Sequence, residues 1–306
     1  MYAAAIRTPL VPIGVITPGG PEIFLKLEML QPIGSFKIRG AYNAVRRLSP
    51  EQLADGVWTV SAGNAAQGVA LAARKVGARC SVMVMDTAPE AKLGNINRLG
   101  ATIVKASYDE CWKTVETHGS PRMTGHFVHP FDDDDFISGN GTAGLEIVED
   151  LPEVDAVIAA VGGGGLLSGI GVALRALRPE AKVYAAEPET AAPLKRSFDQ
   201  GRASRFEEWQ PSFVDGAGGK SVLDTMWPLL REYVDESIVV SLDEVARAMK
   251  LVAERARVIA EGAGACAVAA AMSAAMTARG HKKVVAVVSG GNVDLARFAK
   301  LVGACP

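Results

Sequence analysis

Short apolar runs rich in β-branched residues alternate with helical stretches along most of the chain. We expect strands at VWTV (57–60), CSVMVM (80–85), ATIV (101–104), AVIAAV (156–161), KVYAAE (182–187) and KVVAVVS (283–289). These runs are apolar without alternation, as is typical of parallel strands that are covered on both faces by helices. Residues 64–76 carry Ala and Leu at the spacing of one buried helical face, and Gly77 is a stop signal. The pattern predicts an α/β fold whose ligands bind at the carboxyl ends of the strands.

Composition narrows the class of protein. The chain has 306 residues, of which 49% are hydrophobic, so it can bury a sizeable core in two domains or one large unit. Charged residues make up 22% and the net charge is −2, which argues against a disordered chain and against a polycationic nucleic-acid binder. The longest run of small apolar residues, 262–278, contains Ser273 and predicts a buried helix rather than a membrane span. We expect neither a nucleic-acid partner nor a membrane partner.

The cysteines and the first residues bear on the cellular compartment. Four cysteines (Cys80, Cys111, Cys266 and Cys305) lie far apart without a CxxC pair, so neither a zinc ribbon nor a redox pair is indicated. Scattered free thiols suit a reducing compartment. Residues 1–13 contain one basic residue and two prolines, and they lack the charged start and apolar run of a signal peptide. We expect a cytoplasmic protein.

Glycine is over-represented, and one cluster of glycines points to chemistry. The chain has 32 glycines among 306 residues, or 10.5%. This fraction is above the roughly 7% that is usual in proteins. Gly162–Gly165 stand between the strand 156–161 and the helical stretch LLSGIGVALRAL. Successive glycine N–H groups ahead of a helix form a concavity suited to a phosphate. A tight turn is the alternative, although such a turn needs only one or two glycines. No register of GxGxxG fits here, so a dinucleotide site is not predicted.

A lysine stands where a helix is expected to begin. Lys37 lies in SFKIRG (35–40), which follows a turn, and it is next to Phe36. An amine that is desolvated beside an aromatic ring loses part of its proton affinity, and a Schiff-base amine requires this loss. The alternative is an ordinary surface lysine on a first helical turn, and the spacing alone favours that alternative.

Two further segments change this balance. SAGNAAQ (61–67) follows the strand 57–60 and starts a helix, so it offers N–H groups and small polar side chains to a carboxylate. Its alternative is a simple N-cap by Ser61 or Asn64. SGGN (289–292) ends the strand 283–289 and places a hydroxyl at a carboxyl end, with a plain turn as the alternative. Each segment is weak when taken alone.

Taken together and in this order, the segments resemble the fold-type II pyridoxal-phosphate enzymes, specifically the serine/threonine dehydratase and serine racemase family (tryptophan synthase β-like). The resemblance covers essentially the whole chain. It rests on SFKIRGA (35–41), SAGNAAQG (61–68), HPFDDDD (129–135), GGGGLLSG (162–169), AAEPE (185–189), VDGAGGKSVLDTMWPLL (214–230), EGAG (261–264) and SGGN (289–292). The lysine motif together with the tetraglycine loop is highly specific.

The resemblance implies a fold and its division into domains. The fold is α/β, with two open twisted parallel-sheet domains and the cofactor, pyridoxal 5′-phosphate (PLP), in the interdomain cleft. Residues 1–55 and 133–306 are expected to form a large cofactor-binding domain. Residues 56–132 are expected to form a small mobile domain that binds the substrate carboxylate.

The resemblance also implies the site. Lys37 is similar to the Schiff-base lysine and is the catalytic residue, and Ser289 is similar to the residue that faces the pyridine nitrogen. The expected cofactor contacts are Phe36, Lys37, Asn64, Gly162, Gly163, Gly164, Gly165, Leu166 and Ser289. The expected substrate contacts are Ser61, Ala62, Gly63, Asn64, Ala65 and Gln67. A neutral hydroxyl at the nitrogen leaves the ring a weaker electron sink, which favours prompt β-elimination.

The implied activity is that of a PLP-dependent ammonia-lyase of the L-threonine/L-serine type. The substrate amine displaces Lys37, the freed lysine removes the α-proton and the β-hydroxyl leaves, which yields a 2-oxo acid and ammonia. We expect a small-molecule amino acid as substrate and a homodimer as the assembly. The alternatives are a serine racemase-like enzyme, a β-replacement enzyme of the same fold and a catalytically inactive PLP-binding homologue.

Three departures from the family pattern refine this expectation. Ala62 stands where the racemases have an acid/base serine, and alanine cannot transfer a proton. Ala65 replaces a histidine that is common in the dehydratases, so a bulkier β-substituent, for example an aryl group, becomes possible. The family members that bind a divalent cation use the counterparts of Glu187, Ala191 and Pro193, and proline offers no side-chain oxygen. We therefore expect no metal site and a structural or surface role for Glu187.

Overall fold

The chain forms two compact units in the computed structural model, which describes residues 1–305 without the side chain of Ala91. Unit 1 comprises Met1–Ile6 and Gln31–Asn140, and unit 2 comprises Arg7–Leu30 and the chain from Gly141 onward. Each unit has its own sheet and its own buried apolar cluster. The boundary falls inside helix α6 (Asp134–Asp150), between Asn140 and Gly141.

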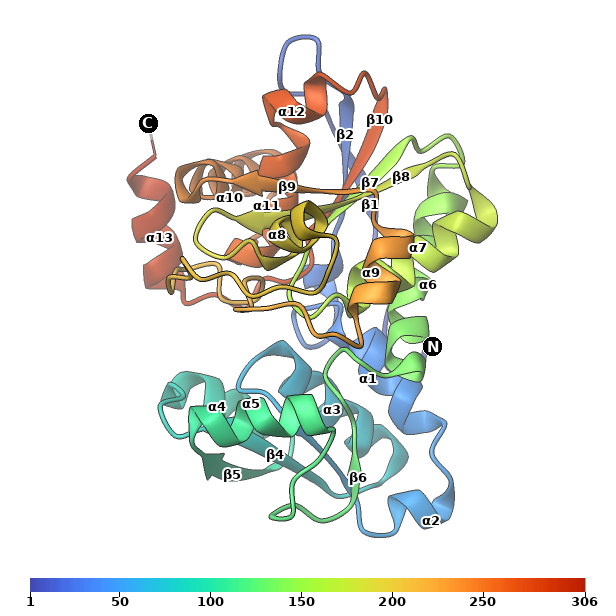
Figure 1. Ribbon diagram of the computed structural model, residues 1–306, viewed down its shortest axis with the longest axis vertical. Helices are drawn as coiled ribbons and strands as arrows, with labels where there is room; N and C mark the ends of the chain where they lie inside the picture. The colour runs from blue at the N-terminus through green and yellow to red at the C-terminus, as the bar shows by residue number, and fades with distance from the viewer. Residues whose placement is uncertain (306) are drawn as a thin grey trace. The chain divides into compact units, whose positions relative to one another are not determined.

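Unit 1 is built on a four-stranded sheet in the order β5-β4-β3-β6, and every pair in it is parallel. Its strands are β3 (Val57–Val60), β4 (Cys80–Met85), β5 (Thr102–Ala106) and β6 (His126–Phe127). Its helices are α1 (Lys37–Arg46), α2 (Pro50–Leu53), α3 (Asn64–Val76), α4 (Glu90–Arg98) and α5 (Tyr108–Thr117). Helices α1 and α3 pack against each other, and α3 also contacts β3 and β4 (Figure 1).

Unit 2 is built on a six-stranded sheet in the order β1-β2-β10-β7-β8-β9. Its strands are β1 (Leu10–Val15), β2 (Glu22–Lys26), β7 (Ala156–Ala160), β8 (Lys182–Pro188), β9 (Glu236–Val240) and β10 (Lys283–Val287). The short 3-10 helix η1 (Glu28–Leu30) follows β2, and the α-helices are α7 (Gly165–Leu177), α8 (Pro193–Gln200), α9 (Trp227–Tyr233), α10 (Leu242–Ala256), α11 (Gly262–Ala271), α12 (Ala274–Thr277) and α13 (Leu295–Gly303). Only the edge strand β1 is antiparallel to its neighbour among the described pairs.

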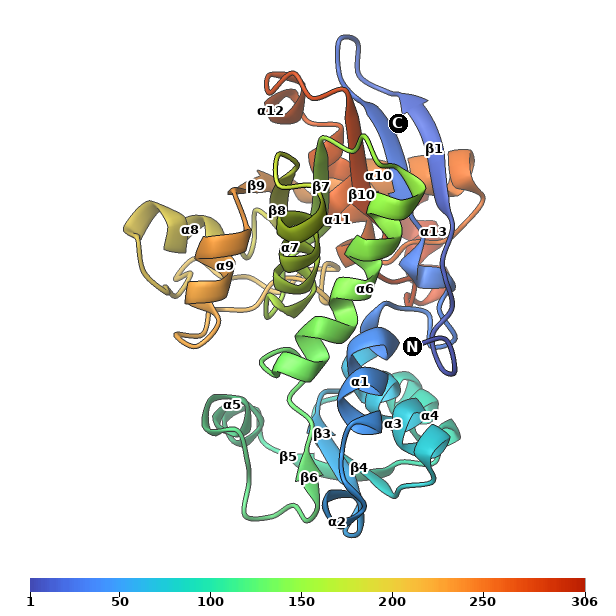
Figure 2. The ribbon, with the colours of Figure 1, turned by 90° about the vertical axis from the view of Figure 1, so that its right-hand side faces the viewer.

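Helices cover both faces of the six-stranded sheet. Helix α7 contacts β7 and β8, and α11 contacts β7, β8, β9 and β10 from the opposite side (Figure 2). All ten residues of α11 are buried, and all of them are Gly, Ala, Val or Cys. A helix that is apolar on every side belongs in the interior of a protein. This packing confirms the predicted α/β class, since β7 is buried along its whole length.

All six predicted strands are confirmed, whereas β1, β2, β6 and β9 were not predicted. VWTV and CSVMVM coincide with β3 and β4, and the other four runs overlap β5, β7, β8 and β10 within one or two residues. The helix over 64–76 is confirmed as α3, and Gly77 ends it with a left-handed φ of 75°. The single helix over 262–278 is wrong, because the Ser273 side chain accepts from Met276 N and starts the separate helix α12.

The predicted domain limits at residues 56 and 132 remain a prediction. The compact units are divided at residues 31 and 140 instead, because α1 packs on α3 and so belongs with the four-stranded sheet. Helix length bears on membrane association: none of the helices within residues 1–305 is long and apolar enough to cross a bilayer.

Candidate active site

Lys37 is the first residue of α1, and its amine lies in a mostly apolar environment within unit 1. The Nζ atom donates a hydrogen bond of 2.6 Å to the Pro130 carbonyl oxygen. It also lies 5.3 Å from the centre of the Phe36 ring and 5.2 Å from that of Phe136. Part of the residue keeps contact with solvent, yet burial of the amine lowers the pKa of Lys37 to about 8. This environment does not match that of an ordinary surface lysine.

The asparagine loop, residues 61–67, connects β3 to α3 in the same unit. Ser61 Oγ accepts a 3.1 Å hydrogen bond from Gly63 N, and Gly63 is the N-cap of α3 without a capping side chain. The alternative of an N-cap by Ser61 or Asn64 is therefore wrong, because Asn64 is already helical. Ala62 is half-buried, while the Ala65 and Gln67 side chains are buried. The first amides of α3 thus lack a side-chain cap, as a site for a carboxylate requires.

Helix α3 lies directly against the lysine segment. A Cβ atom on Gly68 would stand only 3.0 Å from the Lys37 carbonyl oxygen, so a larger residue there would press on the lysine segment. The contact joins the lysine helix to the asparagine loop helix, and α1 and α3 pack along their lengths. Unit 1 therefore holds the amine and the asparagine loop on two helices in direct contact.

The tetraglycine loop lies in unit 2, between β7 and α7. Gly164 is the N-cap of α7, with a φ of 94° and no capping side chain. A Cβ atom there would stand 2.9 Å from a methyl carbon of Leu230, and one on Gly162 would stand 3.2 Å from the Gly216 carbonyl oxygen. Leu166 is buried on the first turn of α7. The bare backbone in front of this helix has the geometry of an anion cradle.

Three other segments of unit 2 lie near this loop. A Cβ atom on Gly216 would stand 3.3 Å from a carboxylate oxygen of Glu261, the N-cap of α11. Glu261 N donates to the Gly290 carbonyl oxygen at 3.0 Å, next to the buried Ser289. Contacts thus run from Gly162 through Gly216 and Glu261 to the segment after β10. Unit 2 brings the tetraglycine loop and the Ser289 turn into one connected cluster.

Glu187, at the end of β8, has a structural role. Its carboxylate accepts from Leu194 N at 2.8 Å and from Lys195 N at 2.7 Å, and Ser237 Oγ donates to it at 2.5 Å. It therefore caps α8, whose first residue is Pro193. Glu187 is fully buried, so the expectation of a structural role fits and a surface role does not. Burial raises the pKa of Glu187 to about 7, although the three hydrogen bonds act in the opposite direction.

The two sets of residues can be tested against a phosphorylated aldehyde such as PLP. The aldehyde needs an amine that is easily deprotonated, and Lys37 offers one. The phosphate needs backbone N–H groups without side chains in the way, and the tetraglycine loop offers them. Two buried hydroxyls on these segments, Ser35 Oγ and Ser168 Oγ, have no hydrogen-bond partner among the described residues. Buried polar groups normally have partners, so these residues fit the cofactor.

Comparison with known proteins establishes the class. Residues 2–290 match the family described as "Pyridoxal-phosphate dependent enzyme". The chain therefore belongs to this family, and pyridoxal 5′-phosphate is its cofactor.

The relatives narrow this class. The chain is 42% identical to L-threonine ammonia-lyase of Thermotoga maritima over 285 residues, which cover 92% of this chain and 70% of that protein. It is 37% identical to serine racemase of Dictyostelium discoideum over 97% of this chain and 92% of that protein. The solved structure of processed threonine deaminase isoform 2 from Solanum lycopersicum superposes with a TM-score of 0.87 at 32% identity, over 99% of this chain and 89% of that one. The expected fold-type II architecture is confirmed.

Sequence reasoning missed two groups that touch the lysine. Pro130 contributes only its carbonyl oxygen, which no side-chain pattern reveals, although it lies in the HPFDDDD segment. Phe136 lies on the first turn of α6, and its ring would collide with a Cβ atom on Gly40 at 2.2 Å. Phe136 comes directly after the acidic stretch 132–135. An apolar residue that follows an acidic helix start was the available signal.

Proposed function

We propose that the protein is a PLP-dependent ammonia-lyase that converts a β-hydroxy amino acid to a 2-oxo acid and ammonia by α,β-elimination. The observation that carries this proposal is the Lys37 amine, which is desolvated between two phenyl rings and held on a backbone carbonyl in a chain of this family. The relatives named as threonine ammonia-lyase and threonine deaminase support the lyase assignment.

In this proposal PLP is held by the residues that the resemblance singles out. Lys37 would bind it covalently, the amides of Gly162–Gly165 and Leu166 would bind its phosphate, and Ser289 would face its ring nitrogen. Phe36 would pack beside the ring, and Asn64 would form a hydrogen bond with the 3′-oxygen that the ring carries. When it is bound, the cofactor withdraws electrons from the substrate Cα atom and so makes the α-proton acidic.

The asparagine loop holds the substrate in this proposal. The carboxylate lies against the first amides of α3, with the side chains of Ser61, Asn64 and Gln67 around it and with Ala62, Gly63 and Ala65 leaving room for it. These amides lie at the positive end of the helix dipole and have no capping side chain. Binding there fixes the direction in which the α-proton points, because the amino group is held at the cofactor.

Lys37 is the base that takes the α-proton. A pKa of about 8 leaves roughly a tenth of such amines unprotonated at pH 7. An amine that has taken the proton becomes an ammonium, and Pro130 O is placed to accept a hydrogen bond from it. The β-hydroxyl then leaves with a proton as water, and hydrolysis of the product releases ammonia.

Racemisation is the second candidate, because serine racemase of Dictyostelium discoideum is a relative over most of the chain. A racemase must deliver a proton to the opposite face of Cα, which requires a second acid/base group. Ala62 occupies the position where the resemblance implies that group, and a methyl group carries no transferable proton. We therefore expect elimination without measurable racemisation.

The first experiment separates a holoenzyme from an inactive homologue. Wild-type protein incubated with PLP should be yellow, borohydride should bleach it, and mass spectrometry should place the reduced cofactor on Lys37. Lys37→Ala should show no covalent label. A wild-type protein that stays colourless contradicts the proposal.

The second experiment fixes the substrate. A panel of serine, threonine and β-aryl serines, assayed for 2-oxo acid release, should show turnover of the aryl or longer substrates at least comparable to that of threonine, because Ala65 lacks the histidine ring. Ala65→His is the matched variant and should favour threonine. Release from serine and threonine alone would contradict the specificity and leave the lyase assignment standing.

We also propose that the protein is a homodimer and that it is cytoplasmic. The homodimer can be tested by sedimentation equilibrium of the full chain in an analytical ultracentrifuge. The cytoplasmic location stays a prediction from the free cysteines and the N-terminal residues.

A further inference from the structure

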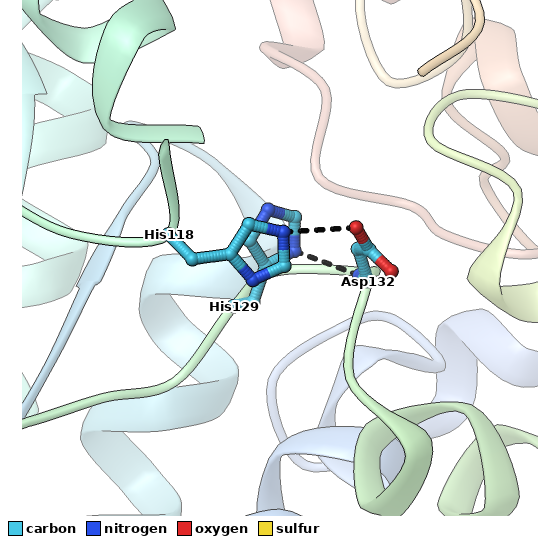
Figure 3. Close-up of side chains that lie close together, drawn as sticks. All are labelled: His118, His129 and Asp132. Atoms are coloured by element: carbon cyan, nitrogen blue, oxygen red, sulfur yellow. Dashed lines mark hydrogen bonds and ion pairs between the residues drawn. The ribbon is translucent and has the colours of Figure 1, made fainter. Parts of the chain in front are cut away.

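A second cluster of titratable groups lies beside Lys37 in unit 1. His118 follows α5, and His129 and Asp132 lie on the loop between β6 and α6 (Figure 3). Their potential ligand atoms all lie within 4.8 Å of one another, so the cluster has the spacing of a cation site. His118 Nε2 stands 3.0 Å from Asp132 Oδ2, and the two imidazole rings stack at 4.5 Å between centres.

Hydrogen bonds to both nitrogens of His129 argue for a different role. Its Nδ1 atom accepts from Asp132 N at 2.7 Å and from Phe131 N at 3.3 Å. Its Nε2 atom faces the Val115 carbonyl oxygen at 3.2 Å, near the end of α5. An amide can only donate and a carbonyl can only accept, so His129 is the neutral tautomer with its proton on Nε2. A metal ion needs a free imidazole lone pair, and His129 has none in this arrangement.

The same hydrogen bonds shape the backbone around Pro130. The imidazole spans the turn 129–132, because its Nδ1 atom is bonded to amides two and three residues further along the chain. Pro130 lies inside this turn, and its carbonyl oxygen receives the Lys37 hydrogen bond at 2.6 Å. The His129 side chain is 2% exposed, so water has little access to compete for these amides. The direction of the Pro130 carbonyl is therefore set by one imidazole nitrogen.

We propose that His129 is a positioning residue for the reaction: it fixes the Pro130 carbonyl, and that carbonyl holds the Lys37 ammonium after the lysine has taken the α-proton. The inference rests on the proposed function, because only a lysine base needs an acceptor for its extra proton. No bond forms or breaks at His129 itself. The proton stays on Lys37 Nζ, and Pro130 O stabilises the charge.

The charges around His129 are compatible with a fixed neutral ring. The titratable groups that act on it are His118, Asp132 and Lys37. Burial, together with the proximity of His118 and Lys37, outweighs the Val115 carbonyl and Asp132 and lowers the pKa of His129 to about 4. The ring therefore stays neutral over the range in which Lys37 titrates, so a change in the charge of His129 does not contribute to that titration.

Two substitutions separate the two nitrogens. His129→Asn places an amide oxygen where Nδ1 stands, so it keeps the acceptor for the turn amides and loses the donor to Val115. His129→Gln places an amide nitrogen near the position of Nε2, so it keeps that donor and loses the turn acceptor. Both variants empty part of the same buried space, so a general loss of packing affects both.

The readout is the pH midpoint of Lys37 in the full chain freed of PLP. Acetic anhydride acetylates unprotonated amines, and mass spectrometry of the Lys37 peptide gives the midpoint without any turnover. Loss of one hydrogen bond to a charged amine corresponds to a fall of about one pH unit. We expect this fall in His129→Gln and a midpoint near that of the wild type in His129→Asn.

Equal midpoints in the two variants, or a rise in His129→Gln, would overturn the proposal. If neither variant folds, nitrogen-15 NMR of the wild-type histidines decides, because a proton on Nδ1 of His129 at neutral pH contradicts the geometry. Failure of the lyase assay leaves the labelling result untouched, so the two proposals fail separately.

Discussion

Burial decides what the amine of Lys37 can do. In water a lysine holds its proton until about pH 10.4, which makes it a poor base at neutral pH. Between two phenyl rings the charged form loses hydration, and the pKa falls to about 8. The Pro130 carbonyl keeps the charged form from becoming too costly. The residue can therefore both release and accept a proton near neutral pH, as a catalytic base must.

The first prediction concerns this titration during cofactor uptake. The rate at which the cofactor-free chain binds PLP covalently should rise about tenfold per pH unit below pH 8 and level off above it, because only the neutral amine reacts. Stopped-flow absorbance measures the rate. Free Nα-acetyl-lysine is the control, and its midpoint should lie about two units higher. A midpoint near 10 in the protein would show that the amine is not desolvated.

The second prediction concerns Gly164. Alanine there is strained by the φ of 94° and crowds Leu230, so Gly164→Ala should destabilise the protein by more than the roughly 1–2 kcal/mol of a left-handed alanine. It should also weaken PLP binding about tenfold, since one misdirected amide bond to a charged phosphate costs about that much. Gly201→Ala is the matched control, with a φ of 67° and no atom within 4 Å of the added Cβ. Equal PLP affinity in the two variants would contradict the cradle.

Helix starts follow two patterns along this chain. The N-cap residue is a serine in helices α2, α5, α10 and α12 and an aspartate in α13. In each case its side chain accepts a hydrogen bond from a backbone N–H group of the first turn. The N-cap residue of helices α3 and α7 is a glycine, which has no side chain to accept a hydrogen bond. Helix α8 takes its cap from Glu187, on the strand before it. The helices without any such cap include the two whose amides are proposed to bind the substrate and the cofactor.

The third prediction concerns the cap of α8. The pKa of Glu187 in the folded protein, about 7, lies above the value of about 4.5 for the unfolded chain, so the folded state binds this proton more tightly. Its contribution to stability is present below pH 4.5 and is lost as the pH rises through 7, by up to about 3 kcal/mol. Urea unfolding at pH 5 and pH 8 should therefore show a larger loss for the wild type than for Glu187→Gln. Glu189→Gln controls for the removal of one negative charge.

The sequence could predict the central strands because β3, β4 and β7 are apolar on both faces. It could not predict β1, β2, β6 and β9. Strand β1 contains Pro12 and pairs antiparallel at an edge, β6 has two residues, and β9 begins with the polar residues Glu236 and Ser237. The tetraglycine loop and the lysine segment could be predicted from the sequence, because consecutive glycines indicate an exposed backbone and a lysine beside an aromatic residue indicates a desolvated amine. The contact between Lys37 and the Pro130 carbonyl could not be predicted, because the direction of that carbonyl depends on a histidine ring and on the fold of the turn.

Across the whole molecule, the four cysteines are unpaired and differ in access. Cys80, Cys111 and Cys266 are buried, while Cys305 is partly exposed. Burial raises the pKa of Cys80 to about 12, and it also raises the pKa of Cys111 and Cys266. A thiol reacts as the thiolate, so these three are protected by both burial and protonation.

The fourth prediction follows from this difference. Ellman's reagent should label about one thiol in the native protein and all four in urea, because Cys305 alone among the four cysteines is not buried. Cys305→Ser should abolish the fast reaction and leave three thiols in urea. Fast labelling of two or more native thiols would mean that the buried cysteines open readily to solvent.

The order of strands in the six-stranded sheet has a consequence for synthesis on the ribosome. Strand β2 pairs on one side with β1, its neighbour in sequence, and on the other with β10, which ends at Val287. The inner edge of β2 therefore has no native partner until residues 283–287 have emerged, whereas residues 31–140 supply the sheet of unit 1 much earlier. A nascent chain carries an open strand edge for most of its translation, and such edges recruit other strands. The growing chain is thus most exposed to aggregation just before strand β10 is made.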